Sequence, residues 1–196
     1  MAYRKLNHID DKIVKATISL AGTPESRKGF ATKDIAERCR VSEYVIFKHF
    51  INKQNLMIVA DKEVMNAFAN GAASLQKQGL DFPGFFNRFL DFLLAHKDLT
   101  FFALNFGHGI PHAADTPVWE NKEYESFLKK NAIAFLDPIL QDENTPALAW
   151  DFFMRNCLYF AGFILFGEWA DNPDNRKLMF SLVSRGIRSF TAEAQA

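Results

Sequence analysis

Apolar residues recur through this chain at the spacing of an α-helix, and the strict alternation that marks a β-strand is never sustained. In residues 8–21, Ile9 and Ile13 fall on one helical face together with later apolar residues. Gly22 then follows as a helix-stop signal, and residues 22–29 have the composition of a loop. The same reasoning along the whole chain predicts an all-α protein of about nine helices.

Ser42 and Asn52 stand where side chains cap helix N-termini. The longest apolar stretch without a charge has 11 residues, whereas a membrane-spanning helix needs about 20. The N-terminal segment has no signal-peptide core, and there are only two cysteines. We therefore expect a cytoplasmic protein without disulfides or membrane contact. The predicted helices cover residues 8–21, 32–39, 42–50, 53–77, 81–96, 97–106, 118–140, 146–169 and 174–190.

The charges are unevenly distributed, although 23 basic and 23 acidic side chains give the chain a net charge of zero. Residues 1–56 contain 11 Lys and Arg against 6 Asp and Glu, and residues 57–196 carry the balancing acidic excess. A basic segment of this kind indicates a nucleic-acid-binding module, with an ordinary solvated face as the alternative. We predict two domains that divide at this point, residues 1–56 and residues 57–196.

Two short helices with a tight turn between them are predicted at residues 32–39 and 42–50. Apolar residues at helical spacing, among them Ile35 and Ile46, can close a small core between them. This pattern indicates a helix-turn-helix, and a tight hairpin within a helical bundle is the alternative. The outward face of the second helix carries side chains of the kinds that contact bases and phosphates in a major groove, namely Glu43, Tyr44, Val45, Phe47, Lys48 and His49.

The segment ATKDIAERCRVSEYVIFKHFINKQNLM at residues 31–57 resembles the DNA-binding signature of the TetR family of bacterial transcriptional repressors. The shared features are an Ile-Ala pair, a later Val-Ser pair, an aliphatic-aromatic pair, and then Phe50, Lys53 and Leu56. Beyond about residue 57 the resemblance rests on the helical plan and the length. It implies a ligand-responsive repressor that binds a palindromic operator as a homodimer. A largely apolar small molecule releases it from DNA, and no cofactor is implied.

The resemblance also implies a role for each matched residue. Two positions depart from the usual pattern. Arg40 stands where the family commonly has Gly in a left-handed conformation, which costs about 1 kcal/mol and adds a cation close to the DNA. Phe47 stands where Tyr is common, so one hydroxyl donor is missing. Base contacts are implied for Glu43, Tyr44, Val45 and Lys48, backbone contacts for Thr32, Lys33, Phe47, His49 and Lys53, and the helix N-cap for Ser42.

Aromatic residues concentrate after residue 80, where 17 of the 21 Phe and all three Trp occur. Most such rings pack in a core, but bulky rings also leave irregular gaps, and aromatic-lined cavities bind small molecules. The resemblance places a ligand-binding and dimerisation domain here. Its expected cavity is lined by Phe68, Phe86, Phe89, Phe102, Phe106, Trp119, Tyr124, Phe127, Phe153 and Phe160, with Asn105, His108, Asn156 and Cys157 as polar contacts.

Residues 147–169 are apolar almost all round, and such a helix has to be buried on every side. The last predicted helix carries an apolar stripe. Two such helices from each subunit predict an isologous four-helix interface, and a monomer in which these helices are central is the alternative. The expected interface residues are Gly162, Phe163, Phe166, Met179, Leu182, Val183, Gly186, Ile187 and Phe190.

Two further features point weakly to other chemistry. His108 and His112 have the spacing of metal ligands on a helix, but Gly109 and Pro111 disfavour a helix there, so we expect no metal. Cys157 as a nucleophile needs an oriented base, which nothing in the sequence specifies. The alternative to a regulator is a helical enzyme or carrier for an apolar small molecule that does not bind DNA.

Overall fold

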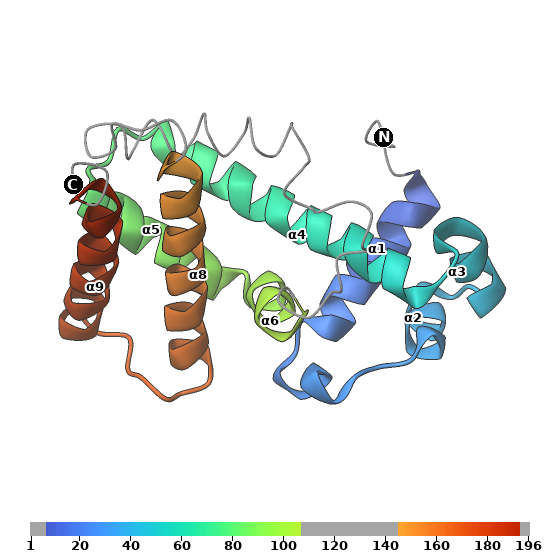
Figure 1. Cartoon of the computed structure of the whole chain (residues 1–196). Helices are drawn as coiled ribbons and strands as arrows, with labels where there is room; N and C mark the ends of the chain where they lie inside the picture. The colour runs from blue at the N-terminus through green and yellow to red at the C-terminus, as the bar shows by residue number, and fades with distance from the viewer. Residues whose placement is uncertain (1–6, 107–144, 193–196) are drawn as a thin grey trace. The chain divides into compact units, whose positions relative to one another are not determined.

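The structure, a computed structural model, describes residues 7–106 and 145–192. These residues form eight α-helices and one short 3₁₀ helix, and no β-strand occurs among them (Figure 1). The predicted all-α class is confirmed. The helix expected at residues 118–140 lies outside the described residues. The α-helices are α1 (His8–Ala21), α2 (Thr32–Cys39), α3 (Glu43–Phe50), α4 (Lys53–Gln76), α5 (Phe82–Ala95), α6 (Lys97–Phe106), α8 (Thr145–Leu165) and α9 (Pro173–Ala192).

Most helix ends lie within two residues of the prediction, and two segments differ more. The expected loop after α1 contains the 3₁₀ helix Pro24–Lys28. Helix α8 ends at Leu165 and not near residue 169. The reason is Gly167, which has a left-handed φ of 74°. This conformation turns the next N–H group back to the Phe163 carbonyl at 2.9 Å, which closes the helix C-terminus.

Side-chain oxygens cap the N-termini of at least four of the described helices, α1, α4, α5 and α9. Asn52 caps α4 as predicted, because its Oδ1 accepts a hydrogen bond from the Asn55 N–H at 2.8 Å. Ser42 is the N-cap residue of α3, as predicted, but its side chain makes no capping hydrogen bond. Helix α1 begins with a reciprocal cap, in which Asn7 Oδ1 accepts from the Asp10 N–H at 2.9 Å and the Asp10 carboxylate accepts from the Asn7 N–H at 3.4 Å.

The described residues divide into two compact units. The head unit contains residues 7–66 and 96–106, and the body unit contains residues 67–95 and 145–192. Helix α6 belongs to the head unit, although it follows α5 in the sequence, because it packs against α1. These units are defined by packing and not by function, so the predicted boundary between functional domains after residue 56 stays a prediction.

Helix α1 forms the centre of the head unit, where it contacts both α2 and α6. Ile13 and Ala21 are fully buried, and Val14 is nearly so. Thr17 is a buried polar residue of this helix, and its hydroxyl donates to the Ile13 carbonyl at 2.8 Å, which satisfies it inside the helix. The helix predicted from the amphipathic pattern is therefore present, and both α2 and α6 cover it.

Gly22 ends α1 for a different reason from the one predicted. Its φ is −83°, so no left-handed conformation requires a glycine here. A Cβ atom at this position would lie only 2.2 Å from the carbonyl oxygen of Asp98 in α6. Glycine is needed because the backbones of α1 and α6 approach each other closely.

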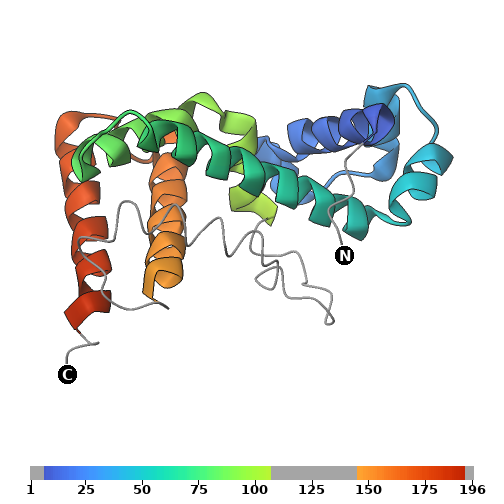
Figure 2. The ribbon, with the colours of Figure 1, turned by 90° about the horizontal axis from the view of Figure 1, so that it is seen from above.

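The body unit contains α5, α8 and α9. Helices α8 and α9 run side by side and antiparallel, and α5 packs against both (Figures 1 and 2). Phe85, Phe89 and Phe153 form its buried core, with ring centroids 5.6–5.9 Å apart. Gly186 lets α9 approach α8, because a Cβ atom there would lie 2.3 Å from the Phe152 ring. None of the described helices combines the length and hydropathy that crossing a membrane requires.

We expect the substitution Gly22→Ala to lower the free energy of unfolding by about 1–3 kcal/mol, because the added methyl group overlaps a backbone carbonyl that cannot move freely. Chemical denaturation followed by circular dichroism measures this loss. Lys15→Ala, at an exposed site on the same helix, is the control and should stay within about 0.5 kcal/mol of the parent. Equal stability of the two variants would show that α1 and α6 do not approach as described.

Candidate nucleic-acid interface

Helices α2 and α3 form two eight-residue helices joined by a three-residue turn, which is the arrangement of a helix-turn-helix. Their facing side chains Ile35 and Ile46 are fully buried, as is Cys39 at the end of α2. Arg40 begins the turn with φ 54° and ψ 46°, in the left-handed region. The left-handed conformation expected at Arg40 is therefore present. The Val41 N–H returns to the Ala36 carbonyl at 3.0 Å and closes the turn.

The predicted outward side of α3 is only partly open to solvent, because Glu43, Val45 and His49 are half-buried. Tyr44, Phe47 and Lys48 are exposed, whereas Ile46 and Phe50 point into the head unit and are buried. Side chains that are not used for packing are available for a partner. The exposed side of the helix therefore carries two aromatic side chains, Tyr44 and Phe47, and the cation of Lys48.

The first turns of α2 and α3 are tied together by their side chains. The Thr32 hydroxyl donates a hydrogen bond of 2.5 Å to the Glu43 carboxylate, and both residues are half-buried. Lys33 is exposed and lies 3.7 Å from Glu37 on its own helix. The structure thus places Thr32 and Glu43 in contact, and the N-terminal ends of the two helices meet there.

His49 points toward α1. Its Nδ1 lies 2.5 Å from a carboxylate oxygen of Asp10, and both side chains are largely buried. The resemblance implies a phosphate-backbone contact for His49, and nothing in the sequence identifies Asp10 as its partner. The two residues are 39 positions apart, and an acidic residue in a first helical turn is common for local reasons. No local signal therefore pairs them.

Lys53, at the start of α4, is held by the segment before α2. Its ammonium group donates to the Phe30 carbonyl and lies 4.1 Å from the centroid of the Phe30 ring, a cation–π contact. Burial lowers the pKa of Lys53, and the nearby Asp34 carboxylate partly opposes this shift. Phe30 also meets Phe106 of α6 edge to face, with centroids 5.9 Å apart. Lys53 is thus part of the packing of the head unit.

The residues expected to line one ligand cavity are divided between the two units. Phe102, Asn105 and Phe106 belong to the head unit. The Asn105 amide binds the Thr23 carbonyl and the Ser26 hydroxyl, each at 2.9 Å, so it holds α6 against the segment after α1. In the body unit lie Phe68, Phe86, Phe89, Phe153, Asn156, Cys157 and Phe160, and outside the described residues lie His108, Trp119, Tyr124 and Phe127.

In the body unit these residues take part in core packing. Phe86 and Phe89 both contact Phe153, with ring centroids 6.5 and 5.7 Å apart. Asn156 donates to the Phe152 carbonyl one turn earlier at 2.7 Å. Cys157 is fully buried, which raises the pKa of its thiol well above the ordinary value. A thiol that stays protonated is a poor nucleophile, and the structure gives no support to catalysis at Cys157.

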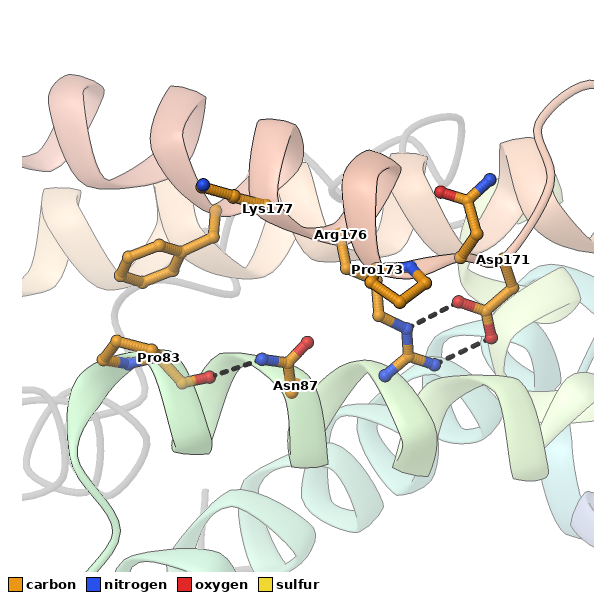
Figure 3. Close-up of a pocket in the computed structure, with 8 residues that line it drawn as sticks. Pro83, Asn87, Asp171, Pro173, Arg176 and Lys177 are labelled. Carbon is orange, nitrogen blue, oxygen red and sulfur yellow. Dashed lines mark hydrogen bonds and ion pairs between the residues drawn. The ribbon is translucent and has the colours of Figure 1, made fainter.

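A pocket of about 540 Å³ lies between α5 and the start of α9 in the body unit, and none of the predicted ligand residues lines it (Figure 3). Arg176 reaches into it and binds the Asp171 carboxylate through two hydrogen bonds of 2.5 and 2.8 Å. Arg176 also lies 2.8 Å from Asp91. These bonds lower the pKa of Asp171 and raise that of Arg176. The cation is thus already balanced by two carboxylates.

The residues expected at a dimer interface do not share one surface. Met179, Val183 and Ile187 are fully buried against neighbouring helices of the same body unit. Gly162 is buried, Phe166 and Gly186 are half-buried, and the Phe190 side chain lies outside the described residues. Phe163 and Leu182 are exposed, as are their neighbours Tyr159 and Leu178, which the predicted interface omitted. The exposed apolar surface of α8 and α9 therefore consists of Tyr159, Phe163, Leu178 and Leu182.

Within the described residues no group of three or more His, Cys, Asp or Glu side chains could hold a metal ion. His108 and His112, the pair weighed as metal ligands, lie outside them. Cys39 is buried like Cys157, and burial raises the pKa of its thiol as well.

Comparisons with known proteins identify the fold. No family model and no curated protein matches this sequence. A TetR family transcription regulator from Marinobacter aquaeolei VT8 superimposes with a TM-score of 0.59 over 89% of this chain and 93% of its own, at 15% identity. A protein from Shewanella sp. PV-4 assigned to the same family gives 0.58 over 90% and 96%, at 14% identity. A transcription regulator from Lactobacillus plantarum gives 0.54 over 88% and 97%, at 16% identity. The resemblance seen in residues 31–57 is thus confirmed as a likeness of fold.

Replacing Arg40 tests the strain in the turn between α2 and α3. We expect Arg40→Gly to be more stable than Arg40→Ala by about 1 kcal/mol, because glycine adopts the left-handed conformation without a Cβ penalty. Both variants lose the same charge, so their comparison isolates the backbone contribution. Thermal and urea unfolding measure the difference. If Arg40→Ala is the more stable of the two, the turn does not hold a left-handed residue in solution.

Proposed function

We propose that this protein is a transcriptional regulator of the TetR family that binds double-stranded DNA through its head unit. The observation that carries the proposal is the α2–α3 pair, which buries its inner residues and leaves Tyr44, Phe47 and Lys48 of α3 exposed. A helix presented in this way is suited to the major groove. The excess of basic residues in residues 1–56 and the fold shared with transcription regulators support the same conclusion.

In this proposal the exposed cations set the affinity. Lys48 and Arg40 are exposed beside the outward surface of α3, and each can neutralise a phosphate and release condensed counterions. Lys53 differs, because its ammonium already binds the Phe30 carbonyl. Its ammonium group stays bound to Phe30 even if it also contacts a phosphate, so in this proposal the main role of Lys53 is to hold the start of α4 in place.

We expect Lys48→Ala to weaken DNA binding and to flatten its dependence on salt. For a dimer, the slope of log K against log salt concentration should become shallower by about 2, because about one phosphate contact is lost from each subunit. Fluorescence anisotropy with a duplex of pooled promoter sequences, titrated at several salt concentrations, measures the slope.

The matched control is Lys177→Ala, which removes the same exposed charge from the body unit. It should leave the slope unchanged. Failure of the parent protein to bind any duplex at low salt, while it remains folded, contradicts the proposed function. An enzyme or carrier without DNA binding then becomes the better account of the fold.

The proposal includes a homodimer, since two recognition helices must lie about 34–36 Å apart to enter successive major grooves of a palindromic operator. The exposed apolar side chains of α8 and α9 support a surface for the second subunit. Tyr159 and Phe163 are one helical turn apart on α8, and so are Leu178 and Leu182 on α9. Apolar side chains gathered in this way on two packed helices are typical of an interface.

We expect Leu182→Glu to convert the dimer to a monomer, because burying an uncompensated carboxylate in the interface costs about 3–5 kcal/mol. Light scattering coupled to size-exclusion chromatography measures the mass. Lys177→Glu, on the same helix, controls for the change of charge and should remain dimeric. A dimer that survives Leu182→Glu unchanged places the interface elsewhere.

The effector in this proposal is a largely apolar small molecule that binds the body. It acts by favouring a conformation in which the two recognition helices no longer match the operator, and its effect is limited by its differential affinity for the two states. The aromatic composition of the body supports this part of the proposal. Native mass spectrometry of the purified protein tests it by detecting a co-purified small molecule that dissociates the DNA complex when it is added back.

A further inference from the structure

Three large apolar side chains are exposed on or directly after α3. Tyr44 is 72% exposed, Phe47 42% and Ile51 75%. Tyr44 and Phe47, spaced i and i+3, lie on one side of α3, and Ile51 is the C-cap residue directly after the helix. Ile46 and Phe50, which alternate with them, are buried and supply the packing of α3. The exposed three are therefore not needed to hold α3 in the head unit.

Ile51 is also held in an unfavourable backbone conformation. Its φ is 68° and its ψ is −52°, and the Asn52 N–H donates to the Phe50 carbonyl at 2.7 Å. This is a γ-turn in its rare, strained form. A β-branched residue with positive φ is an outlier, and glycine relieves the strain at no steric cost. An exposed isoleucine gains no burial here that offsets the strain, and strain that persists without such compensation is characteristic of functional sites.

The chemistry of the major groove points to what these side chains contact. The thymine 5-methyl group is the apolar group that base edges present there. From Tyr44 to Ile51 the backbone advances seven residues, or about 10 Å at the helical rise, which equals about three base-pair steps of 3.4 Å. The apolar row therefore has the length to follow three consecutive base pairs.

We propose that Tyr44, Phe47 and Ile51 read thymine methyl groups, so that each half-site of the operator contains thymines within a run of about three base pairs. For Phe47 this replaces the backbone contact that the resemblance implies, because a phenyl ring has no hydroxyl group to donate to a phosphate. This inference rests on the proposed function. The exposed cations Arg40 and Lys48 stand beside the row. A surface that combines apolar side chains with cations matches the major groove, which offers both methyl groups and phosphates. Such a surface matches an apolar protein partner less well.

The experiment begins by selecting duplexes from a randomised pool with the full-length protein. Each thymidine of the selected half-site is then replaced, one at a time, by deoxyuridine, which removes only the methyl group. For the parent protein, affinity should fall by about fourfold at each contacted thymine. Tyr44→Ala, Phe47→Ala and Ile51→Gly should each abolish this discrimination at one position and leave it intact at the others.

Ile51→Gly carries a second readout that separates recognition from structure. Because glycine relieves the γ-turn, this variant should unfold at a higher denaturant concentration than the parent while it binds the selected duplex more weakly. A residue with only a structural role lowers stability and binding together. Lys48→Ala serves as the comparison, since it should weaken binding to thymidine and deoxyuridine duplexes by the same factor.

The outcomes are distinguishable. If deoxyuridine changes nothing at any position of the selected site, or changes binding equally in the parent and the three variants, the thymine inference is overturned and DNA binding itself stands. If the pool yields no enriched duplex at low salt, both the inference and the proposed function fail. The apolar row on α3 then belongs to a protein interface.

Discussion

The head unit depends on the packing of α1, which lies against α2, α6 and the 3₁₀ helix. At its N-terminus, Asp10 meets His49 of α3 at 2.5 Å. In its middle, Ile13 is completely buried. At its C-terminus, Gly22 lets the α6 backbone approach, and Asn105 of α6 binds the Thr23 carbonyl. One helix therefore contacts α3 near one end and α6 at the other.

This arrangement leaves the outer side of α3 free of any packing duty. Ile46 and Phe50 of α3 are buried in the head unit, and His49 in its last turn contacts Asp10. The exposed side chains of Tyr44, Phe47 and Ile51 are therefore not required for packing and are available to a partner. Two residues of the interface sit in strained backbone conformations, Arg40 at φ 54° and Ile51 at φ 68°. Both lie at the ends of the short helices, where strain defines how α3 is presented.

The sequence predicts local structure well and long-range contacts poorly. The bounds of α2 and α6 follow from local apolar spacing, which is why they agree with the structure. Helix α1 also ends where predicted, but the reason is the close approach of α6 at Gly22 and not a local stop signal. The contact between Asp10 and His49 joins residues 39 positions apart, and Asn105 reaches a carbonyl 82 positions away. No local pattern encodes such pairs. The outward side of α3 could be predicted, since helical periodicity alone separates it from the buried Ile46 and Phe50.

The apolar stripes of the body unit show the same limit. The sequence marks a stripe that includes Met179, Leu182, Val183 and Ile187 as a face that needs a partner. For Met179, Val183 and Ile187 the partner is the rest of the same unit. Leu178 and Leu182, one position away, are the residues left exposed. Amphipathicity shows that a helix face must be covered, but it does not show whether the cover comes from the same chain. Asn105, expected as a polar ligand contact, is half-buried and binds the Ser26 hydroxyl, which holds α6 against the segment after α1.

The central claim is that the outward side of α3 is the surface that contacts DNA. Hydrogen–deuterium exchange of the full-length protein, with and without a short duplex at low salt, tests this most directly. The account predicts slower exchange in α3 and at the start of α2 when DNA is present, and unchanged exchange in α5 and α9. Protection confined to the body unit, or no protection of α3 under conditions where the duplex is bound, would contradict it.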